Sequence, residues 1–435
     1  MAKKRLFVYY SVTPLTYCAV CGKMLSDRTV IKITFTDRSS DMKITIICDV
    51  LGRENNGTTI AAMNLIRSLK SKGHDVTVVC PDEDKKGLEG YVVMPKRSFG
   101  IFDNYVEKNG VTIAKADEDA LRRAIEGADV VHLLVPFMMS WASVKIAQEL
   151  GIPLTASFHC QAENLSAHLF LMNAGHFNND VYRFFYKKVY RYCAAVHYPT
   201  RFIKETFEEA VGAKTNAYVI SNGVNKRFVR RPTEKPENFR DRFVILFTGR
   251  YSKEKSHRVL IDAAAESKYA DRIQLIFAGD GPLKEELGEY AAKKLKNQPL
   301  FRFFSRDEML DVLNYADLYV HPAEIEIEAI SCLEAITCGL VPVIADSPRS
   351  ATRFFALGED NLFRHGDPSS LAGKIDFWIE HPEEKEACRG RYLGYAKQFD
   401  QDACMDGMEK MLRDAAEGRV HGSEEENGIL QRSAE

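Results

Sequence analysis

Long apolar runs are missing from the sequence, since none approaches the ~20 residues that a helix needs to cross a bilayer. If this protein acts on a membrane, we expect it to do so from the surface. The 435 residues carry a formal net charge of −2, which gives no general basic field for nucleic acid. No G-x-G-x-x-G follows Ile47, so the sequence does not support a dinucleotide redox site.

Paired cysteines are also scarce. Most of the ten cysteines lie singly in apolar segments, which is typical of reduced thiols in a cytoplasmic protein. Cys18-x-x-Cys21 lacks the second pair that a zinc site needs. It belongs to residues 1–41, whose pattern differs from that of the rest of the chain. We expect the functional fold to begin at Met42 and residues 1–41 to be a poorly ordered extension.

From Met42 onward, strand-like segments alternate with helical ones. In the first half of the chain the expected strands are 43–50, 75–80, 129–135, 153–158 and 218–220. A loop over 53–59 that contains a glycine precedes an expected helix over 60–72. Such alternation predicts a parallel, doubly wound sheet, whose ligands bind beyond the carboxyl ends of the strands. Residues 42–225 should form this N-terminal domain.

A charged segment with two prolines, residues 226–242, indicates a linker to a second alternating series. The expected strands of that series are 243–247, 273–277, 301–304, 316–320 and 341–345, and the expected helices are 257–267 and 369–380. Residues 243–400 should form a second Rossmann-like domain. A C-terminal helix over 402–416 should pack back on the first domain, and the polar tail over 417–435 should be disordered.

Residues 319–345 have the pattern of a strand, a polar loop, a helix and another strand. The helix is expected to start after Pro322 with three acidic residues at its positive end, Glu324, Glu326 and Glu328. Glu326 lies eight residues before Glu334, and this surplus of acids suggests that one of them accepts hydroxyls of a sugar or ribose. The first-turn amides around Ala329, Ile330 and Ser331 could then hold a diphosphate. An ordinary acid-rich helix N-terminus is the alternative interpretation.

A turn directly after strand 243–247 carries two cations. Arg250 and Lys255 lie at the carboxyl end of the second domain's first strand, beside Gly249 and the start of a helix. Together they could form a two-pronged clamp for a diphosphate and neutralise a departing nucleotide. A solvated basic turn is the alternative.

Histidines follow a strand in each domain. His159 comes directly after strand 153–158, and Glu163 is placed to orient it. A lone histidine at such a position is more often a structural hydrogen-bonding group than a catalyst. His321 is the competing candidate, whereas His132 lies within an apolar strand and is expected in the core.

Residues 181–192 predict a helix rich in aromatic and basic side chains. Its expected apolar face consists of Val181, Phe184, Phe185, Val189 and Tyr192. Its lysines and arginines form another face. Such a helix can lie on an anionic membrane surface, or it can be half-buried in the domain with a solvated basic side.

Taken in order, several of these segments resemble the family-4 retaining glycosyltransferases of the GT-B fold. The matching segments are Asn56-Gly57-Thr58, His159, Ser221-Asn-Gly-Val224, Gly249-Arg250…Lys255, Ala278-Gly-Asp-Gly-Pro282 and Glu326…Glu334. The resemblance covers residues 42–413, and its most specific part is LEAITCGLVPVIA together with Glu326. It implies an α/β protein in which two doubly wound Rossmann-like domains face each other across a cleft.

The resemblance also implies roles for individual residues. Arg250 and Lys255 would bind the donor diphosphate, Glu334 would hold the ribose, and Glu326 would hold the transferred sugar. His159 would contact the donor sugar near the reacting carbon. The other expected substrate contacts are Asn56, Gly57, Thr58, Gly249, Gly281, Ala329, Ile330 and Ser331. The implied reaction is front-face and metal-independent, with the nucleotide sugar as a substrate and no cofactor.

The sequence departs from the family at several positions. Two glycines are usual where this chain has Asn56-Gly57, and an apolar residue is common where it has Glu328. Residues 157–166, with the helix over 181–192, are similar to bacterial enzymes that glucosylate diacylglycerol. This narrower resemblance implies UDP-glucose as the donor, a lipid acceptor, and a cytoplasmic protein at the inner face of the membrane. A soluble sugar acceptor is the alternative.

Two other functions fit the same architecture. One is a nucleotide-sugar epimerase or hydrolase, which would turn over a nucleotide sugar without an acceptor. The other is a non-catalytic nucleotide-sugar-binding subunit, against which the full set of Arg250, Lys255, Glu326 and Glu334 argues. The sequence does not identify the base or the sugar of the donor.

Overall fold

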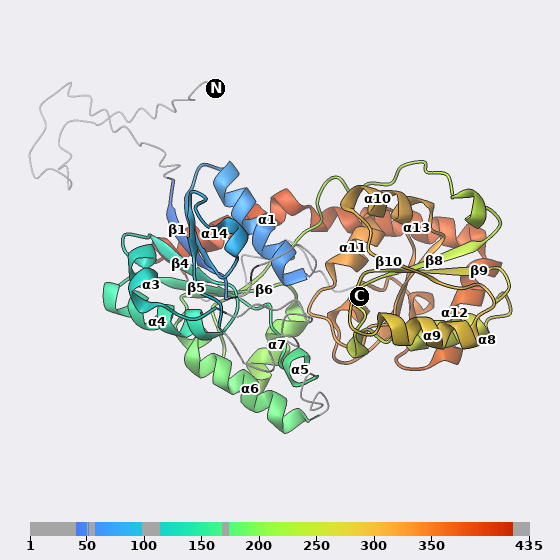
Figure 1. Cartoon of the computed structure of the whole chain (residues 1–435), viewed down its shortest axis with the longest axis horizontal. Helices are drawn as coiled ribbons and strands as arrows, with labels where there is room; N and C mark the ends of the chain where they lie inside the picture. Colours follow the sequence, from blue (N-terminus) through green and yellow to red (C-terminus); the bar gives the residue numbers. More distant parts are fainter. Residues whose placement is uncertain (1–40, 50, 52–56, 98–113, 168–173, 421–435) are drawn as a thin grey trace, which may run out of the picture. The chain divides into compact units, whose positions relative to one another are not determined.

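The structure, a computed structural model, describes residues 41–49, 51, 57–97, 114–167 and 174–420. Expectations for residues 1–40 and for the tail over 421–435 therefore lie outside the described residues. The rest of the chain forms two parallel sheets with helices around them (Figure 1). The predicted α/β class with two doubly wound sheets is confirmed.

The first sheet has seven parallel strands in the order β3-β2-β1-β4-β5-β6-β7. The strands are β1 (Lys43–Ile47), β2 (Asp75–Cys80), β3 (Tyr91–Val93), β4 (Val130–Leu133), β5 (Leu154–Ser157), β6 (Ala195–Tyr198) and β7 (Ala217–Val219). The helices of this part are α1 (Gly57–Ser71), α3 (Glu118–Ile125), α4 (Met138–Leu150), α5 (Ala162–Ala167), α6 (Gly175–Lys188) and α7 (Arg201–Val211). Strands β3 and β6 were not expected from the sequence, and α1 begins at Gly57, which the sequence analysis placed in a loop.

Side chains that alternate along the strands build two cores, one on each face of this sheet. Ile44 and Ile46 of β1 pack against α1 and α14 (Gln401–Ala416). Val131 and Leu133 of β4 pack with α3, α4, α6 and α7 on the other face. Helix α14 contributes four large apolar residues to the first of these cores: Met405, Met408, Met411 and Leu412. The C-terminal helix therefore completes the hydrophobic cover of the first sheet.

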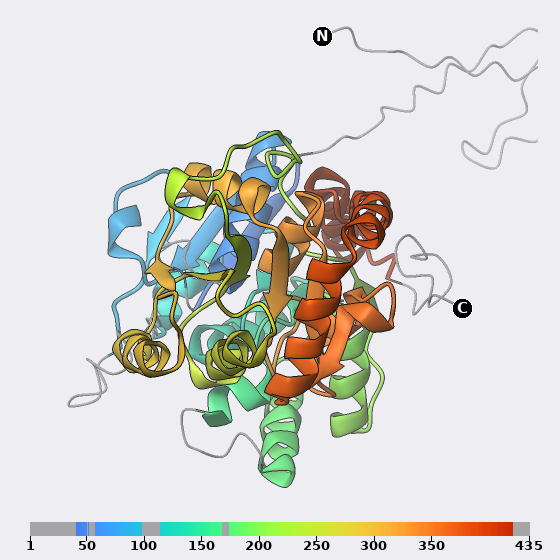
Figure 2. The same ribbon diagram turned by 90° about the vertical axis from the view of Figure 1, so that its right-hand side faces the viewer.

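The second sheet has six parallel strands in the order β10-β9-β8-β11-β12-β13. The strands are β8 (Phe243–Thr248), β9 (Ile273–Ala278), β10 (Leu300–Arg302), β11 (Leu318–His321), β12 (Pro342–Asp346) and β13 (Leu362–Arg364). The helices are α8 (His257–Glu266), α9 (Lys284–Lys294), α10 (Arg306–Tyr315), α11 (Ile330–Thr337), α12 (Pro368–Glu380) and α13 (Pro382–Ala396). Helices α8, α9 and α12 cover one face, and α10, α11 and α13 the other (Figures 1 and 2).

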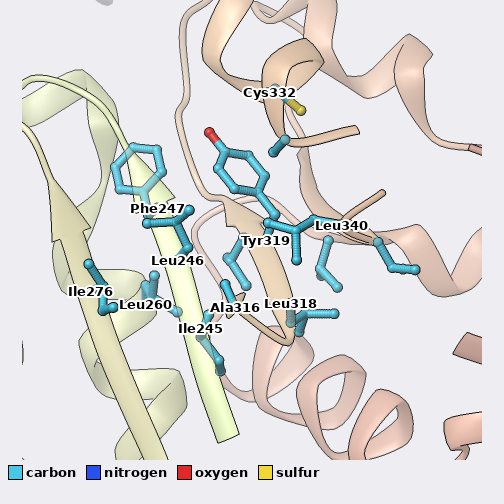
Figure 3. Packing of buried hydrophobic residues seen from close by; sticks show 14 of the residues in the cluster. Ile245, Leu246, Phe247, Leu260, Ile276, Ala316, Leu318, Tyr319, Cys332 and Leu340 are labelled. Atoms are coloured by element: carbon cyan, nitrogen blue, oxygen red, sulfur yellow. The ribbon is translucent and has the colours of Figure 1, made fainter. Parts of the chain in front are cut away.

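The centre of the second sheet is packed with large apolar side chains. Ile245 and Leu246 of β8 lie beside Leu318 and Tyr319 of β11, in register with them (Figure 3). Both strands are apolar up to their last residue, Thr248 in β8 and His321 in β11, because helices cover both of their faces. Strands β8 and β11 are neighbours although β9 and β10 lie between them in sequence, so the winding direction of the sheet reverses between them.

The chain passes between the two sheets twice, once over 220–242 and once over 397–400. The two passages are hydrogen-bonded to each other: Val224 N–H donates to the carbonyl of Phe399 (2.7 Å), and Gln401 N–H donates to the carbonyl of Val224 (3.2 Å). Gly223 fits this contact because a Cβ there would lie 2.7 Å from Cα of Gln401. The two passages therefore lie against each other as a short parallel pair.

We predict that Gly279→Ala destabilises the protein, because its Cβ would lie 2.0 Å from the carbonyl oxygen of Gly249. Overpacking of this kind costs about 1–3 kcal/mol. Gly288→Ala is the matched control, since it lies in α9 with nothing within 4 Å of the new Cβ. That variant should gain up to about 1 kcal/mol from helix propensity. Urea unfolding measures both free energies, and equal effects in the two variants would contradict the close packing at Gly279.

Candidate functional site

The candidate site lies where the winding of the second sheet reverses. Residues 249–256 follow β8 and residues 322–329 follow β11, and the two strands are parallel neighbours. Both segments therefore leave the sheet at its carboxyl edge on either side of the reversal point. In doubly wound sheets this is where ligands bind.

The turn after β8 is fixed by the glycine-containing turn after β9. Tyr251 N–H donates to the carbonyl of Asp280 (3.0 Å), and the Tyr251 hydroxyl donates to the carbonyl of Phe277 (2.7 Å). Gly281 is needed at this contact because a Cβ there would lie 2.6 Å from N and 2.7 Å from O of Tyr251. Arg250 is half-buried, and its neighbour Tyr251 fixes the backbone of this turn through the bonds to Asp280 and Phe277.

Lys255 and Glu326 connect the two segments. The Lys255 ammonium forms a salt bridge with Oε1 of Glu326, and the two side chains are only 18% and 13% exposed. Burial raises the pKa of Glu326, but the charge of Lys255 and the hydrogen bond from His321 outweigh it and hold that pKa at about 2. Glu326 is therefore a carboxylate throughout the physiological pH range, and it is available as an acceptor for hydroxyl groups.

His321 supports the same carboxylate. Its Nε2 lies 3.1 Å from Oε1 of Glu326, and its Nδ1 lies 3.3 Å from the Tyr319 hydroxyl. Burial lowers the pKa of His321 despite the nearby carboxylate, so the imidazole is neutral at pH 7. A carboxylate can only accept hydrogen bonds, so Nε2 of His321 carries the hydrogen and donates a hydrogen bond to Glu326. The competing histidine candidate thus orients Glu326.

The helix after these acids starts later than the sequence predicted. Glu324, Glu326 and Glu328 lie in the loop, and α11 begins only at Ile330. The loop does not continue the helix because Ala329 adopts a left-handed conformation (φ 56°). The loop's own backbone groups bond elsewhere, as when Ala351 N–H donates to the carbonyl of Glu326 (2.9 Å). The expected acid-rich first turn is therefore wrong.

The first turn of α11 nevertheless lies beside the turn that carries Arg250. The Ser331 hydroxyl donates to the carbonyl of Thr248, the last residue of β8 (3.2 Å). Ile330 and Ser331 contribute the free N–H groups of a helix N-terminus at this point, and Ala329 is the residue that precedes them.

Glu334 lies one turn further along α11, three residues after Ser331. Burial raises the pKa of Glu334 to about 7, against the opposing effect of the Arg306 charge. This carboxyl group thus changes its protonation state near neutral pH, unlike Glu326. The two glutamates of the sequence motif have different electrostatic environments.

The candidate residues of the first domain gather around the end of β5. The Thr58 hydroxyl lies 3.5 Å from the carbonyl oxygen of His159, and Gly57 directly precedes Thr58 as the exposed first residue of α1. The ring of His159 meets the edge of His197 at 5.7 Å between centroids. Burial lowers the pKa of His159 well below its ordinary value, so its imidazole is neutral. Asn56, the other residue expected here, lies outside the described residues.

Glu163 does not take the role suggested by its position four residues after His159. Its carboxylate accepts a hydrogen bond from the Tyr182 hydroxyl of α6 (2.6 Å). His132 is fully buried, as a core residue should be. Among the described residues, no group of three His, Cys, Asp or Glu side chains is arranged to hold a metal ion.

Two contacts that the sequence did not predict join the loop over 322–329 to residues of the first domain. Glu328 accepts hydrogen bonds from Asn222, and the Thr200 hydroxyl donates to the carbonyl of Ile327 (2.9 Å). The available signal was the acidic residue two positions after Glu326, where the family commonly has an apolar one. Outside this loop, the side-chain amide of Gln161 donates to the carbonyl of Arg349, in the segment after β12 (3.3 Å).

Helix α6 differs from the expected one in its extent and in its faces. It begins at Gly175 and ends at Lys188, and a 3-10 turn, η3 (Tyr190–Tyr192), follows it. Its buried aromatic residues are Tyr182 and Phe185. The exposed aromatic residues of this region are Phe177, Phe184 and Tyr192, at 38%, 41% and 38% exposure. The expected apolar face is therefore right only in part: Phe185 and Val189 are buried and Val181 packs against the same core, whereas Phe184 and Tyr192 are exposed. Nowhere in the described part of the chain is a helix long and apolar enough to span a bilayer.

Comparisons with known proteins agree with this geometry. The sequence profile described as Glycosyltransferase Family 4 matches residues 55–228, and the profile described as Glycosyl transferases group 1 matches residues 229–391. Together they cover residues 55–391, which include every strand of the second sheet and all strands of the first except β1.

Two curated relatives and one solved structure are similar over most of the chain. The alpha-monoglucosyldiacylglycerol synthase of Streptococcus pneumoniae is 23% identical over 321 residues, which are 70% of this chain and 71% of the relative. The GDP-mannose-dependent alpha-mannosyltransferase of Corynebacterium glutamicum is 24% identical over 379 residues, 81% of this chain and 84% of the relative. The structure of Anabaena HepE in complex with UDP and glucose superposes with a TM-score of 0.67 at 19% identity, over 86% of this chain and all of that one. The chain therefore belongs to glycosyltransferase family 4, has the GT-B fold, and transfers a sugar from a nucleotide-sugar donor.

Proposed function

We propose that the protein is a retaining hexosyltransferase that moves glucose from UDP-glucose to a hydroxyl group of a membrane lipid such as diacylglycerol. The observation that carries this proposal is the cluster at the reversal point of the second sheet. There, an ionised carboxylate, a lysine and the N-terminus of α11 lie together. This set suits a ligand that has sugar hydroxyls next to a diphosphate.

Each part of the donor has a chemical counterpart in the cluster. Arg250 and Lys255 are the cations for the diphosphate, and the amides of Ile330 and Ser331 are neutral donors to it. Gly249 and Gly281 help to fix the turn that carries Arg250, because a Cβ at Gly249 would meet the Phe247 ring and one at Gly281 would meet the Tyr251 backbone. Glu334 is the acceptor for the ribose hydroxyls, and Glu326 for those of the transferred hexose.

The proposed reaction needs no protein nucleophile. The bond between C1 of the hexose and the β-phosphate oxygen breaks, and the electron pair leaves with the diphosphate. Arg250 and Lys255 stabilise the charge that grows there. The acceptor oxygen forms its bond to C1 on the same face, and its proton passes to the departing phosphate oxygen. The two side chains supply the positive charge that a divalent cation supplies in metal-dependent transferases.

His159 suits the donor sugar as a neutral group. Its pKa lies well below the ordinary value, so the imidazole can accept or donate a hydrogen bond to a sugar hydroxyl without adding charge. A protonated histidine beside C1 would oppose the positive charge that develops on the sugar ring as the diphosphate leaves. The buried environment of His159 therefore favours a hydrogen bond that positions the hexose over proton transfer.

The lipid acceptor is supported by the exposed surface of α6. Phe177 and Phe184 are seven residues apart and thus on one side of the helix, and Lys188 lies over the Phe184 ring at 5.9 Å. Exposed aromatic rings among lysines suit the interface of an anionic membrane. The name of the Streptococcus pneumoniae relative, a glucosyltransferase acting on a diacylglycerol, points to the same class of acceptor. We expect the protein to act at the inner face of the cell membrane.

The purified protein should transfer glucose from UDP-glucose to diacylglycerol in mixed vesicles, with an α-linked product. Lys255→Ala should lower kcat about 100- to 1,000-fold, because a charge that stabilises the leaving group is lost. Lys268→Ala is the control, since this lysine pairs with Glu380 on the surface. Mass spectrometry and proton NMR of the lipid product measure the outcome. Release of free glucose at the same rate without any acceptor would support a hydrolase instead.

The affinity for UDP-glucose should depend on pH through Glu334. The pKa of this carboxyl group is about 7, so below that pH it is protonated in a growing fraction of molecules and accepts ribose hydroxyls less well. Affinity should be steady above neutrality and fall by up to about tenfold per pH unit well below pH 7. Calorimetric titration between acidic and neutral pH measures this. Glu334→Gln should remove the dependence, and an unchanged slope in that variant would assign the titration to another group.

Binding to vesicles that contain anionic lipid should require the exposed face of α6. Replacing Lys187 and Lys188 together by Glu should weaken sedimentation with the vesicles by roughly tenfold or more, because each cation contributes about 1 kcal/mol. Phe177→Ser and Phe184→Ser should also weaken it. Phe303→Ser is the control, a more exposed phenylalanine (57%) outside α6. If Phe303→Ser weakens vesicle binding as much as the α6 variants do, the membrane-binding surface does not lie on α6.

A further inference from the structure

The loop that carries Glu326 is held at several points by different elements. Within the second domain, Glu324 N–H donates to the carbonyl of Glu254 (2.8 Å), and Ala351 N–H donates to the carbonyl of Glu326 (2.9 Å). These bonds fix the loop against the turn after β8 and against η6 (Ala351–Phe355). They leave its end, residues 327–329, to be held by other contacts.

That end is held by residues of the first domain. The Thr200 hydroxyl donates to the carbonyl of Ile327 (2.9 Å). Asn222 donates to the carboxylate of Glu328 through both of its N–H groups: the backbone N lies 3.2 and 3.1 Å from the two oxygens, and Nδ2 lies 2.6 Å from Oε2. Glu328 is only 3% exposed and Asn222 only 7%. The contact is therefore a buried, multiply bonded one, of the kind that is costly to break.

The segment just before Asn222 is held at Ile220 by a line of hydrogen bonds across the first sheet. His197 Nε2 lies 2.7 Å from the carbonyl of Ile220, and its Nδ1 lies 2.9 Å from the Ser157 hydroxyl. The same hydroxyl lies 3.0 Å from Nε2 of His132. Burial lowers the pKa of His197 to about 4 and that of His132 to about 3, so both rings are neutral.

Neutral rings allow only one direction for these bonds. His197 must donate from Nε2 to the carbonyl of Ile220, so its Nδ1 accepts from Ser157, and Ser157 accepts from His132. Every group in this line thus has one defined role. The carbonyl of Ile220, two residues before Asn222, is therefore held by a hydrogen bond from His197 whose direction is defined.

We propose that Glu328 is a positioning residue, which through Asn222 holds the Glu326 loop against the first domain so that the carboxylate for the transferred sugar keeps its place in the site. This inference rests on the proposed function of Glu326. An apolar side chain at position 328 could pack here but could not accept the two N–H groups of Asn222. Glu328 therefore adds hydrogen bonds of defined direction to the loop that carries Glu326.

Two of the groups proposed to bind the nucleotide are held by contacts other than this tie: Arg250 belongs to the turn after β8, and Ser331 is bonded to the end of β8. Loss of the tie should therefore leave nucleotide binding intact and impair turnover. Misplacement of a reacting group by about 1 Å can cost about 100-fold in rate.

The first test is Glu328→Gln, which replaces one acceptor oxygen by an NH₂ group facing the donors of Asn222. It is assayed above pH 7, because burial raises the pKa of Glu328 to about 7 and the group is a carboxylate only above that pH. We expect kcat to fall by roughly 10- to 100-fold with the dissociation constant for UDP unchanged within about twofold. Enzyme assay and calorimetric titration with UDP measure the two quantities. A wild-type kcat in this variant would overturn the inference, and an inactive wild-type protein would instead refute the proposed function.

The second test exchanges the charge across the contact. Asn222→Asp alone should lower kcat more than Glu328→Gln does, because it places two carboxyl groups against each other. When Asn222→Asp is combined with Glu328→Gln, the new amide at position 328 can donate to the new carboxylate at position 222 while its oxygen accepts the backbone N–H. The double variant should recover at least about tenfold of the lost kcat, as expected for directly coupled residues. Additive losses would overturn the direct tie.

Glu208→Gln is the matched control for a buried carboxylate. Glu208 is 4% exposed and accepts from both the backbone N–H (2.9 Å) and the hydroxyl (3.0 Å) of Thr215. It should lower the melting temperature without changing kcat. If Glu328→Gln fails to fold, Thr200→Val provides the same readout at the neighbouring tie, where Thr200→Ser keeps the hydroxyl and should retain activity. A loss of kcat in Glu208→Gln equal to that in Glu328→Gln would reduce Glu328 to a general stabilising residue.

Discussion

The buried charge pair of Lys255 and Glu326 is the contact on which the site depends. Each charge is largely removed from water, so each needs the other, and removing one partner of such a pair commonly costs about 3–5 kcal/mol. The pair also joins the segments that follow β8 and β11, and His321 adds a neutral donor to the same carboxylate oxygen. A diphosphate that approaches Lys255 enters this balance of charges and changes the environment of Glu326 at the same time. Groups for the diphosphate and for the sugar are thus electrostatically coupled.

Much of the fold follows from the order of apolar segments, because parallel strands buried on both faces are apolar along their whole length. Strands β8 and β9 were recognised in this way. Strand β6 was not, because it is only four residues long and contains His197, a polar residue that is buried with hydrogen bonds to Ser157 and Ile220. The start of α11 was misplaced because acids near a proline resemble a helix N-terminus, whereas a left-handed Ala329 decides where the helix begins.

The candidate site could be predicted in part, since residues that follow neighbouring parallel strands meet at one edge of the sheet. This places Lys255 beside Glu326 with no knowledge of the tertiary structure beyond strand order. The Glu328–Asn222 contact could not be found in the same way, because 106 residues separate the partners and no periodic pattern relates them. The faces of α6 were also misassigned in part, because the hydroxyl of Tyr182 finds a partner in Glu163 and its ring can then be buried.

The two passages between the sheets, joined by the bonds of Val224 with Phe399 and Gln401, restrict how the halves of the enzyme can move. A single covalent strand would let one half rotate freely about many bonds. Two strands fastened side by side behave as a flat strip, which bends easily across its plane and resists twisting and sliding. Any relative motion of the two halves should therefore pivot at the paired segments around residues 224 and 400.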